Sequence, residues 1–284
     1  AVPAIFAGGI TQINLFVGTI IASQADSAIS YLYYADRLYQ LPLGIIGIAI
    51  SVVLLPELSR HLKGGRLVEA KHSQDSALLI SMLLSLPAAT ALAVLALPII
   101  SVLFERGAFD AVAARATADA LIAFAWGLPA FVLIKVFQPG FFAREDTMTP
   151  TVLATISVVV NIVISFALFP SLQHVGIAIA TTVSAWINTA MLGLILWRRG
   201  HFKLEASEIR RHALILAAAL LMAVVVWGLS LALAPYLAAQ SGLIIKALAL
   251  GLLCVLGLVV YFGLIHVTGV QRLGVLLSRL RRKS

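Results

Sequence analysis

Charged residues are scarce in this chain, and their scarcity excludes an ordinary water-soluble fold. Lys and Arg number 20 and Asp and Glu 12, so 11% of the 284 residues are charged, against about 25% in a typical soluble domain. Hydrophobic residues make up 61%. A soluble fold of this length cannot bury so much apolar surface, so lipid must surround most of it. The sequence predicts an integral membrane protein.

Cysteine and the common catalytic motifs are also nearly absent. The single Cys254 excludes a disulfide framework, and its apolar surroundings predict a buried, inert thiol. The six histidines lack metal-ligand spacing, so we expect no metal site and no cofactor. HExxH, P-loop, nucleophile-elbow and paired-carboxylate patterns are missing, which argues against an enzyme. The net charge of +8 is spread over short connections, which argues against nucleic-acid binding.

Long apolar windows are abundant, and they predict an all-α polytopic transmembrane helix bundle with eight spans. Helices are expected because the windows lack the alternation of barrel strands and an open sheet edge is not satisfied in hydrocarbon. The eight windows are Pro3–Ile21, Ala28–Leu55, Ala77–Phe104, Ala118–Phe137, Val152–Phe169, Ile177–Trp197, Leu214–Leu233 and Leu243–Ile265. An even number of spans places both ends of the chain on one side of the membrane.

The distribution of Lys and Arg among the connections predicts which side that is. One set of connections, which includes the C-terminal tail, carries 15 of them and the opposite set carries 3. Because basic residues are enriched in cytoplasmic loops, both ends of this segment are expected in the cytoplasm. The chain opens at Ala1 directly into its first window, so we interpret it as the back part of a longer protein. The basic stretch Glu57–Asp75 predicts either an interfacial helix or a solvated loop.

The second window carries charge into the membrane, in the segment Tyr31–Gly44. An intramembrane charge indicates a functional site by default. Arg37 suits an anionic ligand, phosphate above all, because its planar fork of donors matches phosphate oxygens; the alternative is that it snorkels outward. Asp36 projects about 100° away around the helix and is expected to pair elsewhere. Lys135, near the inner end of the fourth window, either faces the same cavity or snorkels to the headgroups.

Two further features of the windows have both a structural and a functional interpretation. Pro42, Gly44 and Gly47 predict either close helix packing or a transport hinge. Six polar residues of the fifth and sixth windows are expected to bridge helices, with an oxygen-lined cation site as the alternative. They are Asn161, Ser165, Thr181, Thr182, Ser184 and Asn188.

Two long motifs resemble one known family. The run Tyr33-Tyr-Ala-Asp-Arg-Leu-Tyr-Gln-Leu-Pro-Leu-Gly, continuing to Leu-Pro-Glu-Leu-Ser-Arg60, closely resembles the MurJ/MviN family of lipid II flippases. The stretch Pro139-Gly-Phe-Phe-Ala-Arg-Glu-Asp-Thr-Met-Thr-Pro150 is similar to that family's loop before its eleventh helix. The spacing between the two motifs also fits, and the resemblance covers essentially the whole chain.

The resemblance implies a fourteen-helix exporter fold, of which this chain would hold helices seven to fourteen. Residues 1–200 would form the second six-helix lobe and 201–284 the C-terminal helix pair with a basic tail. The implied activity is movement of lipid II, a polyprenyl-pyrophosphate peptidoglycan precursor, across the bacterial inner membrane by alternating access. The implied partners are lipid II, membrane lipids and the missing N-terminal lobe. Arg37 would meet the pyrophosphate, and the last two spans would border a groove for the polyprenyl tail.

The chain also departs from the family pattern. Gln40 stands where some relatives carry an acid, and a cation site described for some members would need an acid near Ser165, where none is present. Ion coupling therefore stays open. The alternatives to a lipid II flippase are another polysaccharide flippase, a drug/cation antiporter, an intramembrane enzyme acting on polyprenyl phosphates, and a non-transporting scaffold.

Overall fold

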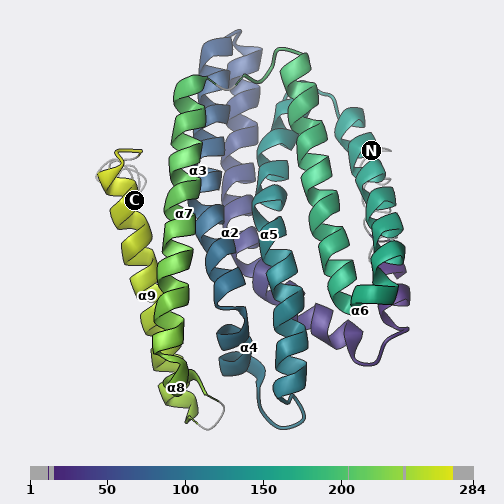
Figure 1. The fold of residues 1–284 in the computed structure, drawn as a ribbon. Coiled ribbons are helices and arrows are strands. Elements are labelled where there is room, and N and C mark those ends of the chain that lie inside the picture. The colour runs from purple at the N-terminus through teal and green to yellow at the C-terminus, as the bar shows by residue number, and fades with distance from the viewer. Residues whose placement is uncertain (1–11, 13–15, 204, 239–240, 271–284) are drawn as a thin grey trace.

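A computed structural model describes residues 12, 16–203, 205–238 and 241–270, and this part of the chain is a bundle of long helices (Figure 1). The helices are α2 (Ala28–Lys63), α3 (Leu67–Val94), α4 (Ala96–Phe104), α5 (Ala111–Phe142), α6 (Met148–Arg198), α7 (Ala206–Ala232), α8 (Ala234–Leu237) and α9 (Leu243–Val267). The predicted class, an all-α membrane bundle, is confirmed. Within the described residues, six helices are long and apolar enough to cross a membrane.

The fifth and sixth predicted windows both lie in α6, which reverses direction part-way. Gln173 has φ 48° and ψ −129°, outside the helical region, and the two arms of α6 fold back on each other there (Figure 1). The element of 51 residues therefore supplies two crossings. A non-glycine residue with positive φ is strained. The first window lies mostly outside the described residues, although 16–22 are helical.

Two of the predicted boundaries are wrong. The stretch Glu57–Asp75 is neither an interfacial helix nor a loop, because α2 continues to Lys63 and α3 begins at Leu67. Basic residues stand in the last turn of α2, where they complement the carbonyl end of the helix dipole. The third window is also interrupted, since α3 ends at Val94 and α4 begins after Leu95.

The core of the lobe forms around α5. Its side chains from Ala114 to Phe141 contribute to two buried clusters, one shared with α2, α3 and α6 and the other with α2 and α4. Asp110 begins α5 by accepting hydrogen bonds from the backbone N–H groups of Val112 and Ala113, at 3.0 and 2.9 Å, which satisfies two orphan donors of the first turn. Gly127 lets α5 approach α6, because a Cβ there would lie 2.7 Å from Thr182 Oγ1.

The C-terminal pair α7 and α9 packs on the lobe through α3. Leu83 of α3 joins Met222 of α7 and Leu253 of α9 in a separate buried cluster. The buried Tyr261 of α9 donates a hydrogen bond from its hydroxyl to the Leu83 carbonyl at 2.8 Å. Cys254 is exposed on α9, so the expectation of a buried thiol is wrong. The apolar run around it is an outward-facing helix surface rather than a core.

A buried ion pair joins the beginning of α9 to the end of α4. Lys246 Nζ lies 3.8 Å from Glu105 Oε2 and 3.4 Å from Ser101 Oγ. The side chains of Lys246 and Glu105 are 8% and 17% exposed. Ser101 also donates a hydrogen bond to the Glu105 carboxylate. This cluster holds the second helix of the C-terminal pair against the lobe.

We expect Lys246→Met to destabilise the protein by on the order of 3 kcal/mol, because it leaves the Glu105 carboxylate buried without its cation. Thermal unfolding of the purified protein in detergent measures the effect. Adding Glu105→Gln to Lys246→Met removes the unpaired charge and should restore part of the lost stability. A double variant less stable than Lys246→Met would contradict this account of the pair.

Candidate functional site

The motif around Arg37 lies on α2, with its apolar positions turned inward. Ala35, Leu38 and Tyr39 are buried, and the Tyr39 ring stacks on Phe124 of α5 with ring centroids 5.0 Å apart. These contacts fix the rotation of α2 about its own axis. Arg37 therefore lies on the opposite, exposed face of the helix.

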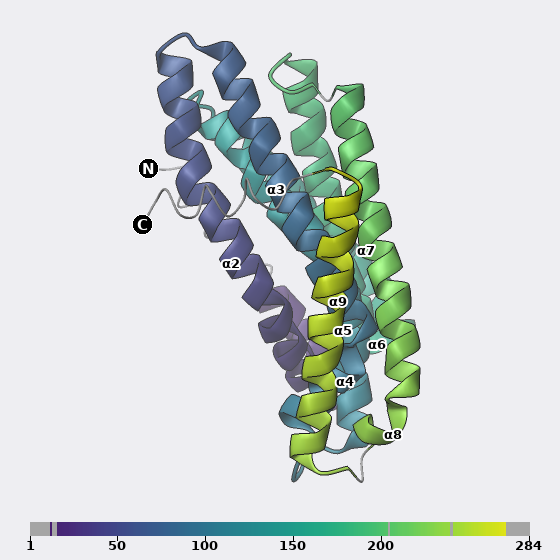
Figure 2. The ribbon, with the colours of Figure 1, turned by 90° about the vertical axis from the view of Figure 1, so that its left-hand side faces the viewer.

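Arg37 stands in a stripe of exposed residues that runs along this face of α2. The stripe consists of Tyr33, Arg37, Leu41, Ile45, Ile48 and Val52. Their spacing of three or four residues is that of one helix face. Figure 2 shows α2 and α7 on opposite sides of the bundle. The stripe is thus well separated from α7. Arg37 gives it one permanent positive charge.

The contacts of Arg37 leave its charge available for a ligand. Its guanidinium carbon lies 4.8 Å from the centroid of the Tyr33 ring, a cation–π distance. The ion pairs of the described residues do not include it. Asp36 instead accepts a hydrogen bond from the side chain of Gln40, four residues along the helix. Asp36 therefore pairs locally, as expected from its position around the helix.

Lys135 does not share a site with Arg37. Its side chain is exposed, and its Cγ lies 3.4 Å from where a Cβ would stand on Gly47. Gly47 is ten residues beyond Arg37, or about 15 Å along the helix axis. The two cations thus lie at different depths of the bundle, and one phosphate group cannot contact both.

The three residues considered as a hinge lie in an unbroken stretch of α2. Pro42 does not interrupt the helix, which spans 36 residues. That length is about 54 Å, longer than a hydrocarbon core of about 30 Å, and Figure 2 shows α2 inclined to α9. A Cβ on Gly44 would meet no atom within 4 Å. Space therefore remains beside Gly44, whereas Gly47 is already covered by Lys135.

Polar residues of α6 bridge its two arms and join them to α5, so the helix-bridging interpretation is confirmed. Ser157 Oγ donates to the Ser184 carbonyl at 2.8 Å, and Asn161 Nδ2 lies 3.4 Å from Thr181 Oγ1. Thr182 Oγ1 donates to a carbonyl of α5 at 2.7 Å. Ser157, Asn161, Thr181 and Ser184 line a cavity of about 190 Å³ together with Asn188.

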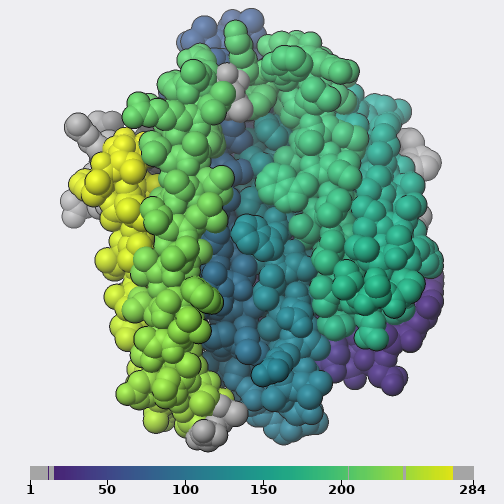
Figure 3. Space-filling view, in the orientation of Figure 1, coloured from purple at the N-terminus to yellow at the C-terminus, as the bar shows by residue number. Residues whose placement is uncertain are grey.

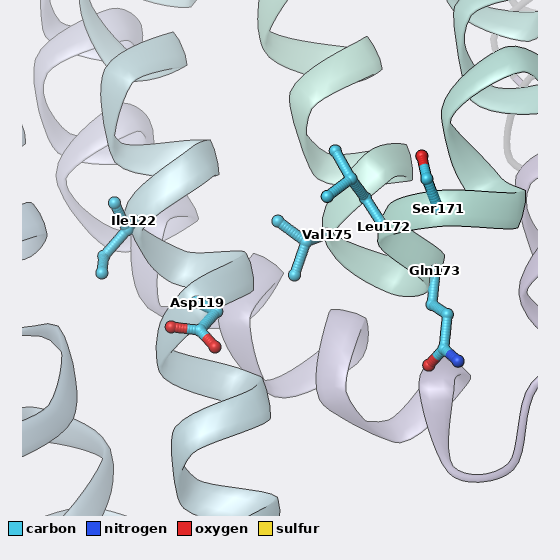
Figure 4. A pocket seen from close by; sticks show the side chains of 6 residues that line it. All are labelled: Asp119, Ile122, Ser171, Leu172, Gln173 and Val175. Atoms are coloured by element: carbon cyan, nitrogen blue, oxygen red, sulfur yellow. The ribbon is translucent and has the colours of Figure 1, made fainter.

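A larger cavity of about 520 Å³ lies beside the reversal of α6 (Figure 4). Asp119 and Ile122 come from α5, and the remaining lining residues come from the reversal itself. They are Ser171, Leu172, Gln173 and Val175. None of the residues singled out from the sequence as substrate-binding or hinge positions lines this cavity.

The second sequence motif forms the connection between α5 and α6, and Asp146 holds it in place. Its carboxylate accepts hydrogen bonds from the N–H and the hydroxyl of Thr149, at 2.9 and 2.7 Å. Arg199, at the far end of α6, donates to the same carboxylate at 2.6 Å. Sequence reasoning gave Asp146 no role, although an acid three residues before Thr149 is a typical helix-start signal.

The pKa of the Asp146 carboxyl follows from these contacts. Partial burial raises the pKa, but the hydrogen bonds from Arg199 and Thr149 and the charge of Arg199 outweigh it, so the pKa is lowered below its ordinary value. His201 lies nearby, and its pKa is lowered by burial and by the charges of Arg144 and Arg199. The connection is therefore a compact, positively charged cluster held by one acid.

A lobe of membrane-crossing helices with an added helix pair defines a multi-pass membrane protein of an exporter fold. A multidrug transporter solved in an outward-facing conformation superposes with a TM-score of 0.61 at 13% identity, over 93% of this chain and 63% of that one. At that identity the likeness shows the fold alone.

The chain belongs to the family described as lipid II flippase MurJ, whose model matches residues 1–248. A probable lipid II flippase MurJ from Rhizobium tropici is 46% identical over 100% of this chain and 53% of its own length. One from Rhizobium meliloti (strain 1021) is 45% identical, over 99% and 52%. The chain therefore spans about half the length of these curated relatives.

A solved structure of the family shows the same arrangement. A lipid II flippase MurJ in an inward closed conformation superposes with a TM-score of 0.77 at 25% identity, over 94% of this chain and 52% of that one. Membership of this family confirms the resemblance seen in the two motifs, and it assigns the chain to a family of transporters rather than enzymes.

The lowered pKa of Asp146 predicts a pH-dependent contribution to stability. A depressed carboxyl pKa stabilises the fold above the unfolded pKa, about 3.9, and the contribution is lost as pH falls through the folded value. Asp146→Asn should therefore lower stability at pH 7 by about 1 kcal/mol. Its difference from the unmodified protein should shrink as the medium is acidified below pH 4.

Thermal midpoints in detergent across this pH range measure the effect. Glu145→Gln is the matched control, because it makes the same change of charge one residue away at an exposed position. Equal losses in Asp146→Asn and Glu145→Gln at pH 7 would mean that overall charge, and not the Asp146 contacts, is responsible.

Proposed function

We propose that this chain is the second lobe and the C-terminal helix pair of a lipid II flippase. In this proposal residues 1–200 form the lobe and residues 201–284 form the helix pair with its basic tail. The complete protein moves the polyprenyl-pyrophosphate precursor of peptidoglycan from the cytoplasmic to the periplasmic leaflet of the bacterial inner membrane by alternating access. Two relatives of which this chain covers about half are named as probable lipid II flippases.

The observation that carries the proposal is the position of Arg37. An exposed guanidinium within a membrane-crossing helix costs about 2.5–3.5 kcal/mol on insertion scales. The ion pairs of the described residues do not include Arg37, and the adjacent Asp36 is bonded to Gln40. A pyrophosphate group would supply the missing anion through a fork of charge-assisted hydrogen bonds. The stripe on α2 that bears Arg37 then faces the partner lobe supplied by the remainder of the protein.

The other proposed site residues do not contact the same phosphate group as Arg37, and each has a separate role. Asp36, bonded to Gln40, sets the local charge balance. Lys135 of α5 lies beside Gly47, which is about 15 Å further along α2 than Arg37. A substrate that moves along the stripe would meet Arg37 and Lys135 in succession. Pro42, Gly44 and Gly47 lie between them, and the free space beside Gly44 leaves room for α2 to bend there.

Substitution of Arg37 in the full-length protein tests the proposal. In cells depleted of their own flippase, Arg37→Ala should abolish lipid II export while its level in the membrane stays near normal. Arg37→Lys keeps the charge but loses the planar fork, so it should retain partial activity at most. Arg60→Ala, at the exposed end of α2, is the matched control and should export normally. Normal export by Arg37→Ala would refute the proposed role of Arg37.

Orientation provides a second test, because the proposal places both ends of this segment in the cytoplasm. Leu67 is the first residue of α3, Ala108 lies in the α4–α5 connection, and both are exposed, at opposite ends of the bundle (Figure 1). With the other cysteines of the full-length protein replaced, a membrane-impermeant maleimide should label Ala108→Cys from the periplasm. Leu67→Cys should react only after the inner membrane is opened. The opposite pattern would reverse the proposed orientation.

A further inference from the structure

A groove with apolar walls opens on the face of the bundle opposite the α2 stripe. Figure 3 shows it between α7 and the second arm of α6, with α3 and α5 at its floor. Its volume is about 450 Å³, and its lining residues include Met82 and Leu86 of α3, Trp126 and Pro129 of α5, Trp186 of α6 and Leu216 of α7. All four helices are long and apolar enough to cross a membrane. The groove therefore opens toward lipid.

Several polar groups along the groove bond within the protein, and the remaining lining side chains are largely apolar, which suits the walls to hydrocarbon. Trp186 donates its indole N–H to the Trp126 carbonyl at 2.9 Å. Thr90 donates to the Leu86 carbonyl at 3.0 Å, and His212 Nδ1 donates to the Glu208 carbonyl at 2.7 Å. The Nε2 atom of His212 is buried and has no hydrogen-bond partner among the described residues. An occupant of this groove therefore gains mainly from apolar contact.

One end of the groove is strongly basic. The connection from α6 to α7 passes over that end (Figures 1 and 3), because these two helices form the groove's walls. Between Arg198 and Arg211 the chain has five basic residues and two acidic ones. Arg198 and Lys203 are exposed. The basic end lies at the membrane surface, where lipid headgroups stand.

Two of the acids near this end are paired with cations. Asp146 is bonded to Arg199, and Glu205 lies 2.7 Å from Lys71 Nζ. The hydrogen bond from Lys71 lowers the pKa of the Glu205 carboxyl, so Glu205 stays ionised and paired. The ion pairs of the described residues include neither Arg198 nor Lys203, although the charge of Lys203 also acts on Glu205. A negatively charged group at the end of the groove would therefore be attracted.

We propose that this groove binds one acyl chain of an anionic phospholipid, with the headgroup beneath the α6–α7 connection. Apolar walls and a basic end match the two parts of such a lipid in the right order. Each methylene group of the acyl chain that becomes buried in the groove contributes favourably to the binding free energy. Arg198 and Lys203 provide selectivity for a negative headgroup over a zwitterionic one. The site is separate from Arg37, which lies on the opposite face.

Tryptophan quenching tests the proposal in the full-length protein, because Trp126 and Trp186 line the groove. Two sets of phosphatidylethanolamine vesicles would be compared. One contains phosphatidylglycerol with brominated acyl chains, and the other contains the same fraction of phosphatidylethanolamine with brominated acyl chains. The quenching of the two groove tryptophans is the quenching measured in the unmodified protein minus that measured in the double variant Trp126→Phe, Trp186→Phe. We expect this difference to be several-fold larger with the brominated phosphatidylglycerol.

Two kinds of variant separate the groove from its basic end. Ala213→Phe fills the groove and should remove the preferential quenching, whereas Ala247→Phe, on an exposed face of α9, should leave it unchanged. Lys203→Gln should weaken the preference for the anionic lipid about fivefold. Lys63→Gln, an exposed cation at the end of α2, is its matched control. If Ala213→Phe does not fold, the Lys203→Gln comparison still decides.

Three results would overturn the proposal. Equal quenching by the two brominated lipids would mean that the groove does not select an anionic headgroup. Displacement of brominated phosphatidylglycerol by a trace of undecaprenyl phosphate would assign the groove to a polyprenyl chain. A dimer that Ala213→Phe converts to a monomer would assign it to a second copy of the protein. The export assay of Arg37→Ala tests the proposed function and not the groove, so its result does not affect these outcomes.

Discussion

A polar side chain in the hydrocarbon core has three destinations: a partner on a neighbouring helix, the membrane surface or a ligand. Most polar groups of this bundle take the first. Thr182 and Thr189 donate to carbonyls of α5, Ser157 joins the two arms of α6, and Lys246 pairs with Glu105. These bonds are also what holds α6 and α9 to the lobe. The need to satisfy polar atoms thus determines how the helices are placed.

Arg37 and Lys135 differ from this pattern, and the difference is what makes them informative. Lys135 lays its aliphatic stem over Gly47 and keeps its side chain exposed. Arg37 rests against the ring of Tyr33, and the ion pairs of the described residues do not include it. It is the tenth residue of α2, a helix longer than the hydrocarbon core is thick. A ligand is the destination that we propose for it.

Much of the fold could be predicted from the sequence, because span length and apolar composition are local properties. The windows in α2, α5, α7 and α9 were located correctly on that basis. The gap between the windows that end at Phe169 and begin at Ile177 also located the reversal at Gln173. The break at Leu95 and the extension of α2 to Lys63 could not be predicted. Leu95 is itself apolar, and a polar helix end that packs on a neighbour has the composition of a loop. These boundaries are decided by tertiary contact.

The candidate site was predictable in part for the same reason. The residue type and depth of Arg37 follow from the sequence, but its exposure depends on Tyr39 stacking against Phe124, which fixes the rotation of α2. Lys135 could be placed near a membrane surface but not beside Gly47, since that position depends on how α5 packs against α2. Lys246 acquires its role through Glu105, which is distant in the sequence. Asp146 acquires its role through the distant Arg199 as well as through the nearby Thr149.

The two faces of the lobe present different chemistry to their surroundings. The α2 stripe combines exposed aliphatic side chains with one unpaired guanidinium, whereas the opposite face has an apolar groove that ends under a basic connection. In lobes that rock against each other, the face that meets the partner changes its environment during each cycle, while the outer face stays in lipid. The two proposals therefore place a mobile charged substrate on the α2 face and a resident lipid in the groove. The core around α5, whose buried side chains run from Ala114 to Phe141, separates the two.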